Sequence, residues 1–396
     1  MHEGPGRPTE PMPHDAEAWF LHAGSGSDFG RLAELRREPY QLPDLAHDEL
    51  LCEPLYGSWE GNMNHALLRK PIDVCKHRGE ERVVVGNSAV LRVLETGSSV
   101  TDYRPGQLAM LFCAAVVDRW GYPELALAYD APGTIGALST RMILRRHELV
   151  PLPEPTRHSL PQWAAFSARY VTAWSNWEQA YGTFRLLVGA DELPSPHVWG
   201  WGGGTTLAEL DLARRHGCET VMLSANERRL SLIAQTGVTA LDRTPYRALC
   251  YDERKFVTDK AFRKQYLEAE AAFLREVDRR TDGMGVQIFI DYIGTPVLRA
   301  TLKALSRQGV ITTAGWQQGM VSSHLRAIEC IGRHQHVHTH YARHRQGVAA
   351  VAYAEREGWV PQLDDRIYEF DEIPQLAQDF AQGRVGFFPV FRVNPE

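Results

Sequence analysis

The sequence predicts an α/β protein in which a doubly wound parallel sheet is joined to a β-barrel-like domain. From Leu160 to Ala342, helical stretches alternate with short β-rich runs, which is typical of a parallel sheet covered by helices. From Ala18 to Val150 the chain instead shows short strands bounded by Gly, Pro and Asp, which indicates a barrel-like domain. Strand-like runs return at the C-terminal end and are expected to complete that domain.

Each domain is predicted from particular runs of apolar residues. The barrel strands are expected at Glu49–Leu55, Arg82–Gly86, Ala89–Gly97, Gly106–Phe112, Arg366–Phe370 and Gly386–Phe391. The strands of the parallel sheet are expected at His197–Trp199, Thr220–Ser224, Val286–Tyr292 and Val310–Ala314. Residues 1–14 hold four prolines and few large apolar side chains, so we expect residues 1–16 to form a flexible tail. The barrel then takes 17–165 and 343–396, and the parallel sheet takes 166–342.

The stretch Val198–Ala208, with the sequence VWGWGGGTTLA, carries the main functional signal. A glycine-packed turn follows an apolar run and opens a helical segment, Glu209–His216. Such glycines let the backbone approach a pyrophosphate, which the free N–H groups and the positive end of the helix then bind. An ordinary exposed turn is the alternative interpretation. The loop predicts an NAD(H) or NADP(H) site.

The end of the second expected strand favours NADPH. The chain reads Ser224-Ala-Asn-Glu-Arg-Arg229, with no acid at the strand tip and two arginines one turn later. An acid at that tip selects the ribose diol of NAD, whereas arginines suit a 2′-phosphate. Alternatively, Arg228 and Arg229 are solvated charges of a helix.

Composition excludes several classes of function. The formal charge of −6 is spread along the chain, which argues against nucleic-acid or anionic-membrane partners. No apolar run approaches the roughly 18 residues that span a bilayer, and no signal-peptide pattern begins the chain. Six scattered cysteines lack Cys-x-x-Cys spacing, so neither a zinc ribbon nor a disulfide framework is indicated. We therefore expect a cytoplasmic protein with reduced thiols and small-molecule partners.

Several segments resemble the medium-chain dehydrogenase/reductase superfamily. Residues 98–107 resemble its barrel-closing turn, with Gln107 in place of Asp, and Tyr170–Trp174 resembles its Thr-Ala-Tyr helix segment. Asp291–Gly294 resembles its Asp-x-x-Gly turn, and Arg307–Gly315 its following strand. The resemblance covers most of residues 40–396. It implies a GroES-like β-barrel catalytic domain and a Rossmann cofactor domain.

Within this superfamily the sequence is most similar to the crotonyl-CoA carboxylase/reductase group. Arg119–Tyr122 resembles its Trp-Gly-aromatic motif, a charged insertion spans Tyr246–Arg280, and His338–Ala342 resembles its Gly-Ser-His-Phe-Ala strand end. The resemblance implies NADPH-dependent hydride transfer to the C=C bond of an α,β-unsaturated acyl thioester, carried on CoA or a carrier protein, in a biosynthetic pathway.

The resemblance also assigns the site. His340 is expected to donate a proton or orient water, while Tyr122 and Asn62 line the substrate pocket; Asn64 is an equal candidate for the family asparagine. The same three residues have a purely structural alternative, as strand, packing and turn residues. The residues expected to bind NADPH are Thr172, Gly200, Gly202, Gly203, Gly204, Thr205, Ser224, Asn226, Arg228, Gly294 and Gly315.

Three departures from the family pattern affect these expectations. Asn87-Ser88 replaces the His-Glu of the zinc enzymes, so no metal site is expected. Pro123 stands where carboxylating members have a glutamate, and Glu124 comes one residue late, so reduction without carboxylation is favoured. Thr206 replaces the last glycine of the loop, where a β-branched residue is expected to narrow the approach of the backbone to phosphate.

Other functions remain open on the sequence. They are a zinc-independent quinone or carbonyl reductase, a reductive carboxylase, and a degenerate, non-catalytic family member. Family resemblance also implies a homo-oligomer, a dimer or tetramer, assembled through the sheet edge near Val310–Ala314.

Overall fold

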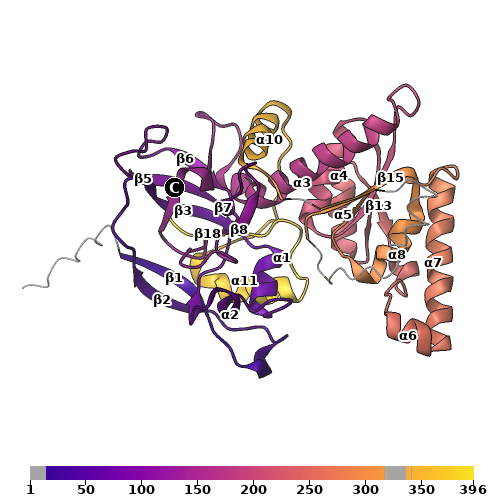
Figure 1. Cartoon of the computed structure of the whole chain (residues 1–396), viewed down its shortest axis with the longest axis horizontal. Coiled ribbons are helices and arrows are strands. Elements are labelled where there is room, and N and C mark those ends of the chain that lie inside the picture. The colour runs from indigo at the N-terminus through magenta and orange to yellow at the C-terminus, as the bar shows by residue number, and fades with distance from the viewer. Residues whose placement is uncertain (1–14, 316–317, 319–335, 340) are drawn as a thin grey trace, which may run out of the picture.

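The computed structural model describes residues 15–315, 318, 336–339 and 341–396. It consists of two parts at the two ends of an elongated molecule, with the long helix α3 (Leu160–Leu187) running between them (Figure 1). Ser159 begins this helix as N-cap, and its side chain accepts a hydrogen bond from the Gln162 backbone N–H. Helix α3 contacts both the barrel strand β3 and the cofactor-domain helix α4.

The first part is mostly antiparallel β-structure. Its strands are β1 (Asp15–His22), β2 (Arg36–Gln41), β3 (Glu49–Ser58), β4 (Arg82–Val83), β5 (Ala89–Thr96), β6 (Leu108–Leu111), β7 (Ala114–Val117), β8 (Pro123–Ala126), β9 (Met142–Arg145), β10 (Leu149–Pro151), β17 (Ile367–Tyr368) and β18 (Val390–Arg392). Its helices are α1 (Gly61–Leu67), α2 (Val74–Arg78), α10 (His344–Glu357) and α11 (Ile373–Ala381).

The main sheet of this part has seven strands, with the path β10-β6-β5-β3-β18-β17 and β9 paired to β3. The C-terminal strand β18 pairs antiparallel with β3, so the end of the chain returns to the first part. Strand β1 begins at Asp15, within the range expected to be a tail, because Asp15 and Ala16 pair with Gln41 and Tyr40 of β2.

The second part is a six-stranded parallel sheet in the order β13-β12-β11-β14-β15-β16. Its strands are β11 (His197–Trp201), β12 (Glu219–Ser224), β13 (Thr239–Asp242), β14 (Val286–Asp291), β15 (Leu305–Thr313) and β16 (His336–Thr339). Its other helices are α4 (Gly204–Arg215), α5 (Glu227–Gln235), α6 (Glu253–Thr258), α7 (Lys260–Arg280) and α8 (Thr295–Ala304). This is the doubly wound order in which ligands bind at the carboxyl ends of the strands. The predicted α/β fold class is therefore confirmed.

The sheet order corrects one expectation. Val310–Ala314 was expected at an oligomer-forming sheet edge, but β15, which holds Val310, lies between β14 and β16. Strand β16 is the edge strand of this sheet. The run in β15 is apolar because both faces of an internal parallel strand are buried, and burial alone does not identify an edge.

The charged insertion forms the helical outer layer of the second part. Figure 1 shows α6 and α7 at the end of the molecule farthest from the barrel. Phe273 of α7 packs with its ring centroid 5.1 Å from that of Trp201 and 6.4 Å from that of Trp199. These aromatic contacts hold the insertion against the sheet face beneath the glycine-rich loop.

Candidate functional site

The glycine-rich loop connects the carboxyl end of β11 to helix α4. Gly203 is the N-cap of α4, and no side chain caps the helix there. A Cβ atom built on Gly203 would meet no atom within 4 Å, so this side of the loop is open. Free backbone N–H groups at an uncapped helix start, beside open space, form an anion site. The loop residues therefore fit the pyrophosphate of a dinucleotide.

Thr206 lies beneath this loop rather than on its open side. It is fully buried, and a Cβ on Gly200 would lie 2.7 Å from its Cγ2, while a Cβ on Gly202 would overlap its Oγ1. The third glycine of such loops normally permits close packing of helix on strand. Here Gly200 and Gly202, which have no side chains, leave the space that the Thr206 side chain fills. The expected narrowing of the phosphate approach is therefore wrong.

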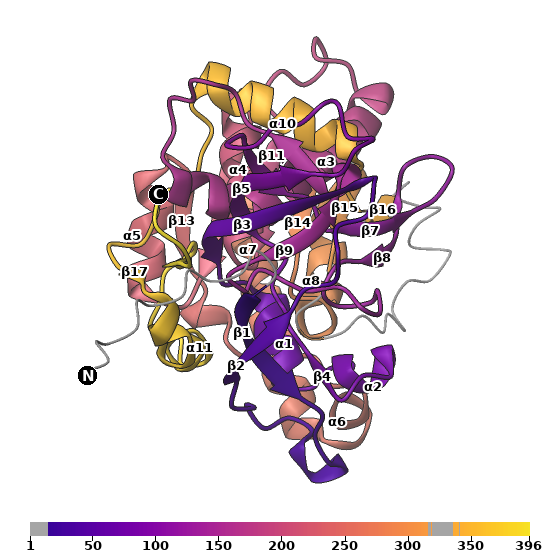
Figure 2. The same ribbon diagram turned by 90° about the vertical axis from the view of Figure 1, so that its left-hand side faces the viewer.

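The other residues expected to bind the dinucleotide follow the carboxyl ends of neighbouring strands. Ser224 ends β12, and Asn226 caps α5 by accepting a hydrogen bond from the Arg229 backbone N–H at 3.1 Å. Gly294, at φ 90°, precedes α8, and Gly315 follows β15. Figure 2 views the molecule from the barrel side, with the parallel sheet behind the barrel strands. These predicted residues therefore lie at the carboxyl ends of the parallel strands.

The arginines at this edge differ in what they contact. Arg228 is exposed and donates a hydrogen bond from Nη1 to the backbone carbonyl of Arg384 at 3.0 Å, and Arg229 lies over the ring of Phe387. Arg243, which directly follows β13, was not predicted. Its backbone N–H donates to the carbonyl of Ser224 at 3.0 Å, and the described residues offer its guanidinium no ion-pair partner. Burial lowers the pKa of Arg243. It is a half-buried cation beside the β12 tip.

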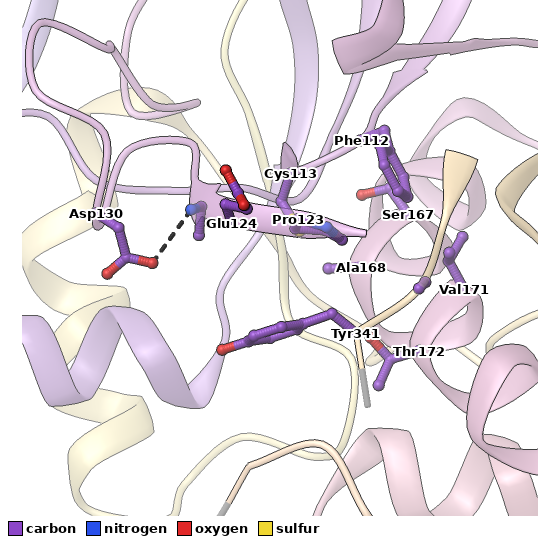
Figure 3. Close-up of a pocket in the computed structure, with 12 residues that line it drawn as sticks. Phe112, Cys113, Pro123, Glu124, Asp130, Ser167, Ala168, Val171, Thr172 and Tyr341 are labelled. Carbon is purple, nitrogen blue, oxygen red and sulfur yellow. Dashed lines mark hydrogen bonds between the residues drawn. The ribbon is translucent and has the colours of Figure 1, made fainter. Parts of the chain in front are cut away.

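A pocket lies where α3 meets the barrel domain (Figure 3). Its lining is mostly apolar. Its lining residues are Phe112, Cys113, Pro123, Glu124, Ala126, Asp130, Ser167, Ala168, Val171, Thr172, Tyr341 and Ala342. Thr172, predicted from sequence as a cofactor contact, thus joins the pocket to the second domain.

The three predicted catalytic residues are not brought together by the described structure. His340 lies outside the described residues. Tyr122 is half-buried just before β8, with the Arg343 guanidinium 4.8 Å from its ring centre, and it does not line the pocket. Asn62, in α1, donates from Nδ2 to Oδ1 of Asn87 at 3.1 Å. Neither Tyr122 nor Asn62 is among the residues that line this pocket, and their role at a substrate site stays a prediction.

The pocket instead gains Glu124 through an irregularity in strand pairing. Val117 pairs with Pro123 and Val116 pairs with Leu125, so Glu124 is an unpaired, bulged residue. A bulge changes the direction of the side chains around it, which places two successive residues, Pro123 and Glu124, along the same pocket. Glu124 is exposed there. Glu124 stands one residue later than the glutamate of carboxylating members, and the pocket wall still carries a carboxylate.

Two further pocket groups were missed by the sequence reasoning. Tyr341 follows the undescribed residue 340, and Figure 3 shows its ring crossing the pocket opposite Pro123. Tyr341 is 59% exposed, and partial desolvation by its neighbours raises its pKa, so its phenol keeps its proton at neutral pH. Burial also raises the pKa of the Cys113 thiol to about 12, so this cysteine is no thiolate nucleophile.

A buried ion pair supports the floor of the site. Arg169 of α3 donates from Nη1 to Ser58 Oγ at 2.7 Å and from Nη2 to the Trp59 carbonyl, and its Nη1 lies 3.5 Å from Glu60 Oε1. Burial raises the pKa of Glu60, and Arg169 opposes that shift. A Cβ on Gly204 would lie 3.0 Å from Arg169 Cδ. The pair thus connects the barrel to the start of α4.

The described residues show no sign of two other kinds of site. Among them, no group of three or more His, Cys, Asp and Glu side chains is placed to hold a metal ion. None of the described helices is both long and apolar enough to cross a membrane.

The chain is similar to crotonyl-CoA enzymes over nearly its whole length. No family model matches it. A crotonyl-CoA reductase of Streptomyces avermitilis is 20% identical over 410 aligned residues, which cover 95% of this chain and 88% of that protein. A solved crotonyl-CoA carboxylase/reductase, AntE in complex with NADP, superposes with a TM-score of 0.78 at 19% identity, covering 98% and 97% of the two chains.

A second solved structure extends the likeness. The 2-octenoyl-CoA carboxylase reductase CinF, in complex with NADP and 2-octenoyl-CoA, has a TM-score of 0.78 at 18% identity and covers 98% of this chain and 89% of its own. Each superposition covers 98% of the chain and so includes both the parallel sheet and the separate antiparallel part. The chain therefore has the fold of these crotonyl-CoA carboxylase/reductases, and its sequence is similar to that of a crotonyl-CoA reductase over nearly its whole length.

Proposed function

We propose that this protein is an NADPH-dependent enoyl-thioester reductase, which reduces the C=C bond of an α,β-unsaturated acyl thioester. The observation that carries the proposal is the junction at Thr172: one helix, α3, lines an apolar pocket and borders the sheet edge that carries the open glycine loop. An acyl chain in that pocket would lie beside the nicotinamide end of the site. The relatives named above act on or bind such thioesters.

The chemistry requires orientation more than strong acids or bases. NADPH, when bound, supplies a hydride to the β-carbon of the enoyl group, and the electron pair of the C=C bond moves to the α-carbon as an enolate that takes up one proton. The chain's task is to align the acyl group and deliver that proton. His340 stays our predicted donor. Tyr341 is a described second candidate, because its protonated phenol lies across the pocket.

Selection of NADPH over NADH is assigned to the arginines at the β12 edge. Neither Ser224 nor Asn226 is an acid that would bind a ribose diol. Arg243 supplies a cation that no described carboxylate neutralises. Arg228 lies in the first turn of α5, four residues after Ser224. A 2′-phosphate suits this edge.

A second candidate function is reductive carboxylation, in which the enolate takes up carbon dioxide in place of a proton. It is favoured by one observation, that the bulge at Glu124 keeps a carboxylate on the pocket wall. The same site would then require bicarbonate or carbon dioxide as co-substrate. We rank it second because Glu124 is exposed and Asn62 contacts Asn87 outside the pocket.

We also propose that the enzyme works as a cytoplasmic homo-oligomer in a biosynthetic pathway.

Direct assays distinguish the candidate functions. Purified protein is mixed with NADPH and crotonyl-CoA or 2-octenoyl-CoA, with and without bicarbonate, and products are separated by mass. Saturated thioester, with absorbance loss at the NADPH band, supports reduction, and a mass gain of one carboxyl group supports reductive carboxylation. Activity with quinones or aldehydes alone would contradict both.

A further inference from the structure

A glutamate is buried beneath the glycine-rich loop without a cation beside it. Glu209, in the second turn of α4, is completely buried. Its Oε2 accepts a hydrogen bond from the Tyr292 hydroxyl at 3.4 Å, and its Oε1 has no hydrogen-bond partner among the described residues. Burying a carboxyl group with only one of its oxygen atoms hydrogen-bonded costs free energy. Such a group is therefore expected to have a structural or functional role.

The hydroxyl of Tyr292 connects this glutamate to another element. Asn176 of α3 donates from Nδ2 to the Tyr292 hydroxyl at 2.6 Å. Tyr292 itself follows β14, and its backbone N–H donates to the carbonyl of Trp201 at 3.2 Å. A Cβ on Gly202 would lie 3.0 Å from Tyr292 Cβ. Glu209, Tyr292 and Asn176 therefore form one hydrogen-bonded chain directly under the loop.

The three members belong to three elements that the proposed reaction must align. Glu209 lies on the helix whose start would bind the pyrophosphate, and Tyr292 lies in the turn that ends with Gly294. Asn176 lies one helical turn beyond Thr172, which lines the acyl pocket. A network of buried hydrogen bonds restricts the relative positions of the elements that it joins.

We propose that Glu209 is a positioning residue for the reaction: through Tyr292 and Asn176 it fixes the cofactor loop relative to the helix that lines the acyl pocket. The inference rests on the proposed function. Burial raises the pKa of Glu209 well above its usual range, and the hydrogen bond from Tyr292 opposes that shift. The described group that faces Glu209 is the Tyr292 hydroxyl, which Asn176 of α3 contacts in turn; no charged described side chain contributes to the shift.

The test compares an isosteric with an apolar replacement. Glu209→Gln keeps the size and an oxygen acceptor, whereas Glu209→Leu leaves the Tyr292 hydroxyl without its acceptor and Tyr292→Phe removes that hydroxyl. Val277→Ala, a cavity variant in the core of α7, controls for general loss of stability. For each full-length variant we would measure the NADPH dissociation constant by nicotinamide fluorescence, then kcat and KM with an enoyl-CoA.

We expect Glu209→Gln to stay within about twofold of the wild type at pH 7, and Glu209→Leu and Tyr292→Phe to lower kcat by about tenfold, with a smaller change in KM. Their NADPH dissociation constants should rise by about threefold or more, while Val277→Ala changes neither. In the wild type, affinity should also fall at alkaline pH as Glu209 ionises, and in Glu209→Gln this fall should disappear.

Glu209→Leu with wild-type kcat and NADPH affinity would overturn the inference while leaving the proposed function intact. So would an alkaline loss of affinity that persists unchanged in Glu209→Gln. A wild-type protein that binds no NADPH would instead overturn the proposed function, and the inference with it.

Discussion

At the scale of single residues, Arg243 is the most informative addition to the site. It follows β13, fourteen residues beyond Arg229, where the segment expected to hold the phosphate-binding arginines ends. Only strand pairing shows its place, because its backbone N–H reaches the carbonyl of Ser224 at 3.0 Å. Neighbouring tips of parallel strands meet regardless of their separation in sequence. Arg228, which was predicted, has part of its guanidinium engaged by the Arg384 carbonyl.

We expect Arg243→Ala to weaken NADPH binding about tenfold or more and to leave NADH binding nearly unchanged. The reason is the loss of a charge-assisted hydrogen bond to the 2′-phosphate, which NADH lacks. Fluorescence titration with both nucleotides measures the ratio. Arg279→Ala, which removes an exposed arginine paired with Glu276, is the control and should change neither constant. Equal losses for both nucleotides would contradict the assignment.

Thr206 shows where reasoning from a motif alone fails. The motif predicts glycine at this position. In the structure, Gly200 and Gly202 leave the volume that the Thr206 side chain fills. We expect Thr206→Gly to destabilise the protein by about 1–3 kcal/mol, from the glycine in a helix and the space left behind, without tighter NADPH binding. Chemical denaturation and NADPH titration of the same preparation test this.

The companion change is Thr206→Val. The Thr206 hydroxyl is buried and has no hydrogen-bond partner among the described residues. Valine of nearly the same shape removes that polar group, so we expect unchanged or higher stability. A clear loss of stability in Thr206→Val would show that the hydroxyl does have a partner.

At the scale of elements, the sequence predicts strands well where one face or both faces are buried. The expected runs at Ala89–Gly97, Thr220–Ser224 and Val286–Tyr292 correspond to β5, β12 and β14. It places helix starts less well, since α4 begins at Gly204, five residues before the expected Glu209. Glycine and threonine are weak helix formers, and only the loop geometry brings them into the first turn.

The junction between α3 and the barrel gives an element-scale prediction. Arg169 and Glu60 are both buried, and Arg169 also donates to Ser58 Oγ at 2.7 Å. Removing one partner leaves an unpaired buried charge, so Arg169→Ala should lower the free energy of unfolding by about 3–5 kcal/mol. The double replacement Glu60→Gln with Arg169→Met should be milder. Urea denaturation measures both.

The matched control for this junction is Arg157→Ala. Arg157 is exposed and lies 3.9 Å from Glu355, so its loss should change stability by less than about 1 kcal/mol. A loss for Arg169→Ala no larger than for Arg157→Ala would show that the buried pair does not hold α3 to the barrel.

At the scale of the whole molecule, buried carboxyl groups set how stability depends on pH. Burial raises the pKa of Glu148 to about 7 from the ordinary 4.5, and burial also raises the pKa values of Glu60, Glu209 and Asp291. The folded protein keeps protons that the unfolded chain releases. Stability from these groups is therefore full below about pH 4.5 and is lost as the pH rises toward the folded pKa.

For Glu148 the shift corresponds to about 3 kcal/mol between pH 4.5 and 7. We expect Glu148→Gln to reduce the fall in stability over this range by about that amount. Denaturation curves at several pH values test it, with the exposed Glu95→Gln as control. A Glu148→Gln curve parallel to that of the wild type would show that Glu148 has an ordinary pKa in the folded state.

Much of the whole molecule follows from its sequence, and the substrate site follows least. The α/β class, the Rossmann order and the position of the glycine loop depend on local patterns that a chain must carry to form them. The pocket is lined by segments far apart in the sequence, those of Glu124, Thr172 and Tyr341 among them, and it depends on a bulge that no local pattern marks. His340 as proton donor stays a prediction.

The most direct test of the account is a titration of the purified protein with NADPH and NADH, followed by tryptophan and nicotinamide fluorescence. We predict saturable binding of NADPH, at least tenfold tighter than that of NADH, because the loop binds the pyrophosphate and Arg243 the 2′-phosphate. Binding of neither nucleotide would contradict the proposed reductase and would favour a non-catalytic role for this fold.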